Sequence, residues 1–285
     1  MERSLSIVGA GRVGRTLGKR LRHLGWRVGA VVTRSEAASR AAVRSIGAGK
    51  PHAGLSRSVF DSNVILLTVP DTALAPVAQA LARLADKSLR GKIVLHTSGA
   101  LDRTVLRPLA LRGASVGSLH PMQTFSGRGT PNLKGVIFAV EGDRRAQLVA
   151  RGIARTLGGV PVAINGKNKP AYHAAGALVA GHGLALVESA AQVLRRIGFT
   201  RSSAVQALLP LMRQMLDNYE RHGPQTAWTG PISRGDFAIV KQHKRAMQNH
   251  PREFQNSYAA LSLLAGRVLA KNPAATLKQL KRALK

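Results

Sequence analysis

The most constraining feature of the chain is a glycine pattern that directly follows a short apolar run. Leu5-Ser-Ile-Val8 leads into Gly9-Ala10-Gly11-Arg12-Val13-Gly14, and a second apolar run, 28–33, follows after a gap of helical length. This order of strand, glycine turn, helix and strand is the setting that a dinucleotide-binding fingerprint requires. Gly9 would allow the tight turn, Gly11 the approach of a pyrophosphate, and Gly14 close packing of the helix. We predict that residues 9–14 bind a dinucleotide; the alternative is a Rossmann-type domain without a ligand.

The end of the second strand predicts which dinucleotide is bound. An NAD site usually has an acidic residue there for the ribose 2′-hydroxyl, whereas this chain has Thr33-Arg34-Ser35. An arginine can pair with a 2′-phosphate. Glu36 fits the first turn of the next helix, where an acid suits the helix dipole. We therefore predict NADP as the cofactor; the alternative is that Arg34 is an ordinary surface arginine.

The first half of the chain alternates strand-like and helical patterns, which predicts an α/β fold with a doubly wound parallel sheet. Strands are expected at 5–8, 28–33, 64–69, 93–96, 115–119, 136–140 and 160–164, and helices at 13–24, 36–46, 74–84, 104–111 and 144–157. The second half contains only helical patterns, at 169–197, 202–220, 233–249, 251–270 and 274–284. We predict a Rossmann domain over 1–165 and an all-helical substrate and dimerisation domain over 166–285.

Composition limits the partners of the chain. The net charge is +30, but the basic residues are spread over the whole length and no nucleic-acid motif occurs. Specific nucleic-acid binding is therefore not expected, although nonspecific binding at low salt is. The chain has no cysteine, so disulfides, thiolate metal sites and cysteine nucleophiles are excluded, and no metal is expected. A signal-peptide pattern is not seen, nor is an apolar run of about 18 residues. A cytoplasmic location without a membrane partner is expected.

Polar residues at the predicted strand ends are candidates for catalysis, because ligands of open α/β sheets lie at those ends. Ser98 could bond a substrate carbonyl or hydroxyl and also contact the cofactor, or it could be a turn residue. His120 could transfer the proton that accompanies hydride transfer, since histidine titrates near neutrality, or it could be structural. Gln123 could orient a polar substrate. Val69-Pro70 is expected to lie along the cofactor ribose, with Asp71 as a helix cap.

The predicted helical domain offers three further candidates. Lys169 and His173 are four residues apart and therefore share a helix face. Arg234, in a Gly-Pro-Ile-Ser-Arg-Gly-Asp segment, could pair with a substrate carboxylate, or the segment could be a capping turn before the next helix. Both Lys169 and Arg234 would suit an anionic small-molecule substrate.

Together these motifs resemble the two-domain Rossmann-like/DUF2520 proteins of the 6-phosphogluconate dehydrogenase-like, β-hydroxyacid dehydrogenase-type group of NADP oxidoreductases. The resemblance covers nearly the whole chain and implies a Rossmann domain, a helical dimerisation domain, a homodimer and NADP, without naming a substrate. Besides the fingerprint, it rests on Val69-Pro-Asp71, His96-Thr-Ser-Gly99, Leu119-His-Pro-Met-Gln-Thr-Phe125, Tyr172-His-Ala-Ala175 and Thr229-Gly-Pro-Ile-Ser-Arg-Gly-Asp236.

Related families sharpen the expected roles. Ser98 and the His-Pro-Met segment are similar to motifs of prephenate and arogenate dehydrogenases that contact the substrate, which makes Ser98 and His120 the first catalytic candidates. Ketopantoate reductases place a catalytic lysine at the start of the helical domain, which suggests Lys169. One departure is that the asparagine usual in the long helix is replaced by Gly181-His182.

We therefore expect an NADP-dependent oxidoreductase acting on a small carbonyl or imine, such as a 2-keto acid like ketopantoate. The alternative is a non-catalytic NADP-binding sensor or partner-binding protein.

Overall fold

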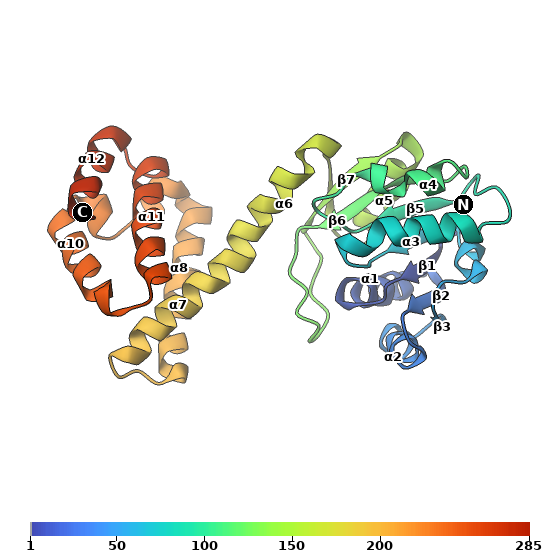
Figure 1. The fold of residues 1–285 in the computed structure, drawn as a ribbon, viewed down its shortest axis with the longest axis horizontal. Helices are drawn as coiled ribbons and strands as arrows, with labels where there is room; N and C mark the ends of the chain where they lie inside the picture. Colours follow the sequence, from blue (N-terminus) through green and yellow to red (C-terminus); the bar gives the residue numbers. More distant parts are fainter. Residues whose placement is uncertain (1) are drawn as a thin grey trace. The chain divides into compact units, whose positions relative to one another are not determined.

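The computed structural model describes residues 2–285, whose contacts divide into two compact units on either side of the Ala180–Gly181 bond. The first unit contains the sheet, and the second is helical (Figure 1). The predicted α/β domain followed by an all-helical part is therefore confirmed.

A single eight-stranded sheet in the order β3-β2-β1-β4-β5-β6-β7-β8 forms the centre of the first unit. From β3 to β6 all neighbouring strands are parallel, and so is the pair β7 and β8. The strands are β1 (Ser4–Val8), β2 (Arg27–Thr33), β3 (Lys50–Ala53), β4 (Val64–Leu67), β5 (Ile93–His96), β6 (Ser115–Pro121), β7 (Ile137–Gly142) and β8 (Val160–Ala163).

Helices cover both faces of this sheet, as expected for a doubly wound fold (Figure 1). One core contains Leu17, Ile46 and Ile153 from α1 (Arg12–His23), α2 (Glu36–Ile46) and α5 (Arg144–Thr156). The opposite core contains Leu74 and Leu109 from α3 (Asp71–Leu84) and α4 (Arg107–Ala110). The short 3₁₀ helices are η1 (Arg57–Asp61), η2 (Arg103–Leu106) and η3 (Gly166–Asn168).

Two features of the sheet differ from the prediction. Strand β3, Lys-Pro-His-Ala, was not expected, because its polar residues and its proline lack the apolar pattern of a strand; as an edge strand it tolerates both. Strand β7 runs antiparallel to β6, although a parallel sheet was expected. The connection between them contains no helix among the described residues, and such a direct return joins antiparallel neighbours.

The second unit consists of helices with a small core of its own. These are α7 (Gly183–Arg196), α8 (Arg201–Ala227), α9 (Pro231–Arg234), α10 (Phe237–Ala246), η5 (Met247–Asn249), α11 (Arg252–Val268) and α12 (Pro273–Ala283). Val240 and Leu280 are fully buried there, on α10 and α12. Helix α8 is broken near its end at Gly223, whose φ of 77° is not helical.

One long helical segment, Gly166–Arg196, joins the two units in sequence. It comprises η3, α6 (Lys169–Ala177), a π-helical turn η4 (Leu178–His182) and α7. The predicted domain boundary followed the last strand at residue 165, whereas the contacts assign α6 to the first unit. The unit boundary falls inside the π turn.

The same segment has the length and composition of a membrane span, with a mean hydropathy of 1.4 and only 6% of its apolar window buried. The expectation that no apolar run reaches about 18 residues is therefore wrong. The run was overlooked because many small residues, such as Ala and Gly, separate its Leu and Val residues and weaken the apolar pattern.

Candidate functional site

The glycine fingerprint forms the turn between β1 and α1. Gly9 has a φ of 87°, and a Cβ there would lie 2.4 Å from Cγ1 of Val69, so no other residue fits. A Cβ on Gly14 would lie 2.4 Å from Oγ1 of Thr68, which shows how closely α1 packs on the sheet. Gly11 differs, since the nearest atom to its Cβ would be the Gly9 carbonyl oxygen at 3.9 Å. Space beside Gly11 is what the approach of a pyrophosphate to the start of α1 requires.

The tip of β2 contains no free carboxylate. The Ser35 side chain caps α2 by accepting from the Ala38 N–H at 3.3 Å, and Thr33 Oγ1 donates to the Ser35 carbonyl at 2.8 Å. Glu36 lies in the first turn of α2, as predicted, and pairs with Arg40. Arg34 is exposed at this tip, so its guanidinium is accessible to an anion.

Ser98 lies in the turn after β5, where its hydroxyl is fully engaged. It donates to Oδ2 of Asp71 at 2.8 Å and accepts from the N–H groups of Ala100 and Leu101. Asp71 is the first residue of α3, and Pro70 occupies the capping position at which Asp71 was expected. Ser98 therefore links the loops that follow β4 and β5, the two strands next to β1 on that side.

His96 shapes the same turn from the last position of β5. Its Nδ1 accepts from the Ser98 N–H at 3.2 Å, and its Nε2 lies 3.2 Å from the Asp102 carbonyl oxygen, which assigns the proton to Nε2. Burial, with a smaller effect of the Lys169 charge, lowers the His96 pKa to about 3. This buried ring is therefore neutral at physiological pH.

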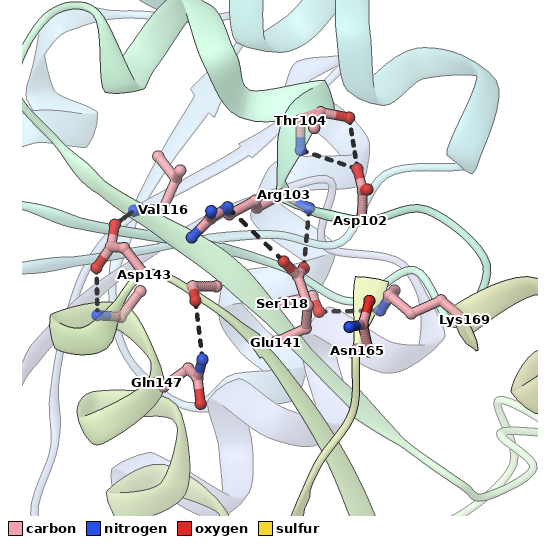
Figure 2. Close-up of polar contacts among 12 residues, drawn as sticks. Asp102, Arg103, Thr104, Val116, Ser118, Glu141, Asp143, Gln147, Asn165 and Lys169 are labelled. Carbon is pink, nitrogen blue, oxygen red and sulfur yellow. Dashed lines mark hydrogen bonds and ion pairs between the residues drawn. The ribbon is translucent and has the colours of Figure 1, made fainter. Parts of the chain in front are cut away.

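Lys169, the first residue of α6, is 0% exposed and holds the centre of the site. Its Nζ donates to the Ser98 carbonyl oxygen and to Oγ of Ser118, each at 2.9 Å, as Figure 2 shows for Ser118. Burial lowers the Lys169 pKa to about 8, and nearby Glu141, Asp102 and Asp71 oppose that shift. The lysine thus joins β6 to the loop after β5.

Glu141 on β7 completes the charged surroundings of Lys169. Its carboxylate accepts from the Arg103 N–H at 2.9 Å and lies 3.9 Å from the Arg103 guanidinium (Figure 2). Burial raises the Glu141 pKa, while the Arg103 N–H and the Lys169 charge oppose the rise. Asp102 accepts from the Thr104 N–H and hydroxyl, and these bonds keep its pKa low.

His120 lies on β6 and forms a cluster with the start of α6. Its Nδ1 is 3.0 Å from the Tyr172 hydroxyl, and its ring meets the rings of Tyr172 and His173 edge to face. Gly99 is packed against both histidines, since a Cβ there would lie 2.6 Å from His173 Cδ2 and 2.8 Å from His120 Nε2. The first unit therefore brings together His120, His173, Lys169 and Ser98 from three separate segments.

The protonation of His120 differs from the expectation of a near-neutral pKa. Burial lowers its pKa to about 4, and the charges of Lys169 and His173 add to the shift. Burial also raises the Tyr172 pKa to about 12. The pair is consequently neutral at pH 7, with one shared hydrogen bond.

The remaining candidates belong to other segments of the chain. Gln123 is exposed in the loop after β6, where its Oε1 accepts from the Thr124 N–H. Arg234 belongs to the second unit and pairs with Asp236 at 3.1 Å. His182 is exposed at the last position of the π turn.

Several residues of the site were not proposed from the sequence as site residues. Tyr172 was visible only as part of a motif, although an aromatic hydroxyl next to a histidine could have drawn attention to it. Ser118 and Glu141 lie within apolar runs, where a polar residue buried in a strand is the available signal.

The fold and the fingerprint define a class of two-part proteins with a Rossmann sheet built for a dinucleotide. The sequence matches the family model of a Rossmann-like domain over residues 2–121 and that of the domain of unknown function DUF2520 over residues 136–265. The chain is therefore a Rossmann-like/DUF2520 protein, as the motifs suggested. No curated protein matches it.

Solved structures share this fold at low sequence identity. The "putative NADP oxidoreductase" of Bacteroides fragilis has 21% identity and a TM-score of 0.77, with 97% of this chain and 98% of that chain covered. A reductive aminase from Aspergillus terreus, solved with NADPH and ethyl-5-oxohexanoate, has 20% identity and a TM-score of 0.68, with 94% of each chain covered. A 1-pyrroline-5-carboxylate reductase from Streptococcus pyogenes has 14% identity and a TM-score of 0.60, with 99% and 98% covered.

Proposed function

We propose that the chain is an NADP-dependent oxidoreductase that reduces a small carbonyl or imine compound. The observation that carries this proposal is the arrangement at one end of the sheet. An open glycine turn begins α1, and polar groups gather after β4, after β5 and on β6. Neighbouring parallel strands end at the same edge, which is where ligands of such sheets bind.

The cofactor fits the residues present. Gly11 and the free N–H groups at the start of α1 suit a pyrophosphate, and the exposed Arg34 suits a 2′-phosphate. Glu36, the nearest acid, is engaged by Arg40. Bound NADPH would supply the hydride. Three of the solved structures support this chemistry. They are the reductive aminase solved with NADPH, the NADP oxidoreductase of Bacteroides fragilis and the pyrroline-5-carboxylate reductase.

The proton is assigned to the cluster around His120. In the direction of reduction, the carbonyl oxygen or imine nitrogen would take its proton from His120 in the protonated form, and in the direction of oxidation the neutral imidazole would accept that proton. The Tyr172 hydroxyl fixes the ring through Nδ1. An anionic substrate beside the ring would raise the His120 pKa toward neutrality, because an opposite charge favours the protonated form. We further propose His173 as a substrate contact.

Ser98 and Lys169 act in this proposal mainly by position. Their bonds hold the loop after β5 against β6 and therefore set the place of His120 relative to the cofactor turn. Gln123 and Arg234 are proposed to bind the substrate, Arg234 through an acidic group. The proposed substrates within the carbonyl and imine classes include 2-keto acids such as ketopantoate.

The first experiment is a thermal-shift titration with NADPH, NADP⁺, NADH and NAD⁺. A ligand that binds the native state raises the melting temperature by mass action. We expect a shift with NADPH and NADP⁺ that is lost in Arg34→Ala and kept in Arg44→Ala, a matched arginine in the last turn of α2. No shift with any nucleotide would refute the cofactor assignment. Binding without oxidation of NADPH across a panel of carbonyls and imines would favour the non-catalytic alternative.

We also propose that the chain is a cytoplasmic homodimer. Large apolar side chains are exposed along the π turn, α7 and α8, including Val179 at 78% and Leu184 at 70%. A second copy can cover such a surface in a self-complementary way, which removes the need for a lipid environment. Sedimentation of the protein with the membrane fraction would contradict this.

A further inference from the structure

Helix α1 is unusually basic on its outer surface. Its twelve residues include Arg12, Arg15, Lys19, Arg20 and Arg22 and no acid. Helices usually place acids in the first turn, where they interact favourably with the dipole, and α1 has none there. The positive end of the helix and its cations therefore reinforce each other.

A groove of about 380 Å³ runs beside this helix. Among its eleven lining residues are four cations, Arg12, Arg15, Lys19 and Arg128, and no carboxylate. Within residues 2–285, none of these four side chains makes a salt bridge. Hydroxyl groups of Thr16 and Thr130 also line the groove, whereas the Ser126 hydroxyl donates to the Arg128 carbonyl oxygen at 3.1 Å. Unpaired cations together with hydroxyls are the donor set that phosphate oxygens prefer.

The far wall of the groove is a loop that is held in place. Arg20 donates from Nη2 to the Pro131 carbonyl oxygen at 2.7 Å, which fastens the loop to α1. Gly127, with a φ of 83°, lies over the Arg12 side chain, since a Cβ there would be 3.2 Å from Nε. Arg128, the next residue of this loop, lines the same groove as Arg15 and Lys19.

We propose that this groove is a second anion site, which takes a compact ligand carrying two or more phosphate groups. Its volume is that of a small-molecule pocket. Several cations around one groove suit a di- or triphosphate better than a single carboxylate, because each phosphate adds charge and acceptor oxygens. The proposal does not depend on the chain being a reductase.

The site differs from the dinucleotide turn in the groups it uses. The fingerprint offers backbone N–H groups at the start of α1, whereas the groove offers side chains along two turns of the helix surface, from Arg12 to Lys19. The two share only Gly11 and Arg12. Inorganic pyrophosphate in the groove should therefore bind in the presence of NADPH.

The test is calorimetric titration of the full chain with inorganic pyrophosphate and tripolyphosphate at about 0.15 M salt, where surface charges are screened. It is run with and without saturating NADPH. The test variant is Lys19→Gln/Arg128→Gln, which leaves the fingerprint intact. The control is Arg144→Gln/Arg151→Gln on α5, which removes the same charge elsewhere. Melting temperatures verify that both variants fold.

We expect one pyrophosphate per chain, affinity lowered about tenfold or more in the test variant, and unchanged affinity in the control. Equal weakening in both variants would reduce the effect to general charge and overturn the proposal, as would absence of binding. Competition with NADPH would place the anion in the dinucleotide turn instead. Affinity that rises with the length of a single-stranded oligonucleotide, without pyrophosphate binding, would assign the groove to nucleic acid.

Discussion

The Nζ of Lys169 lies 2.9 Å from Oγ of Ser118, which ties the start of α6 to a strand 51 residues earlier in the chain. The same nitrogen donates to the carbonyl oxygen of Ser98. One fully buried amine thus connects the loop after β5, the strand of His120 and the helix of Tyr172 and His173. A substitution of Lys169 should therefore disturb the positions of all three segments.

Replacement of Lys169 by Met should change how stability depends on alkaline pH. The folded-state pKa is lowered to about 8 from 10.5, so between these values the unfolded chain holds a proton that the folded chain has lost. The free energy of unfolding of the wild type should therefore rise as the pH increases from 8 to 10.5, and it should be lower at pH 8 than at pH 10. In Lys169→Met that rise should vanish. Urea denaturation at pH 7.5, 9 and 10 measures it, and an unchanged slope in the variant would contradict the burial of the amine.

Acid should destabilise the protein through its buried histidines. The pKa of His96 is lowered to about 3 and that of His120 to about 4, both from 6.5. Below pH 6.5 the unfolded chain gains protons that the folded chain rejects, so stability falls as pH drops toward 4. The expected loss is about 1 kcal/mol per pH unit for each histidine. His96→Gln should flatten the profile and His23→Gln, an exposed control, should leave it unchanged in denaturation at pH 7, 6 and 5.

Two fingerprint glycines should respond differently to alanine. In Gly14→Ala the new Cβ would meet Thr68 Oγ1 at 2.4 Å, so the melting temperature should fall, corresponding to about 1–3 kcal/mol of overpacking. In Gly11→Ala the nearest non-neighbouring atom within residues 2–285 is the Gly9 carbonyl oxygen at 3.9 Å, so stability should be retained while NADPH affinity falls about tenfold or more. Parallel melting curves and NADPH titrations separate the effects, and equal stability losses would mean that Gly11 is only structural.

His120 and Tyr172 should affect turnover and leave cofactor binding intact. We expect His120→Ala to lower kcat by about 10²-fold or more once a substrate is found. Tyr172→Phe removes the hydroxyl that faces Nδ1, and a smaller loss of about tenfold is expected. NADPH oxidation and NADPH titration are measured side by side. Full activity in His120→Ala would remove this residue from the mechanism.

The exposed apolar surface near the π turn should determine the oligomeric state. Val179→Glu places a charge at a site that is 78% exposed in the single chain, so the fold should persist while a dimer should dissociate. Light scattering after size-exclusion chromatography, with Val160→Glu on β8 as an exposed control, measures the mass. A wild type that is monomeric, or a variant that remains dimeric, would contradict the proposed interface.

Local patterns made much of the fold predictable. Seven of the strands were predicted from apolar runs such as 64–69, whereas β3 was not predicted because Lys-Pro-His-Ala resembles a loop. The direction of β7 depended on a loop that returns without a helix, which periodicity does not reveal. In the site, Ser98 and His120 were visible by their position at strand ends, but two partners of Ser98, Asp71 and Lys169, lie 27 and 71 residues away in the chain. The low pKa of His120 results first from burial and then from the charges of Lys169 and His173, which only folding brings close to the ring.

The π turn at Leu178–His182 has a consequence for the helix as a whole. Such a turn contains one residue more than an α-helical turn, so the residues after it are displaced by about 100° around the axis. The face of α6 that carries Lys169, Tyr172 and His173 therefore does not continue into α7 at the usual spacing. Deleting a single residue here would restore ordinary α-helical spacing and rotate every side chain of α7 by about 100° around the helix axis. Such a deletion would leave every residue of the site unchanged, yet it would alter the helical register of all the residues that follow.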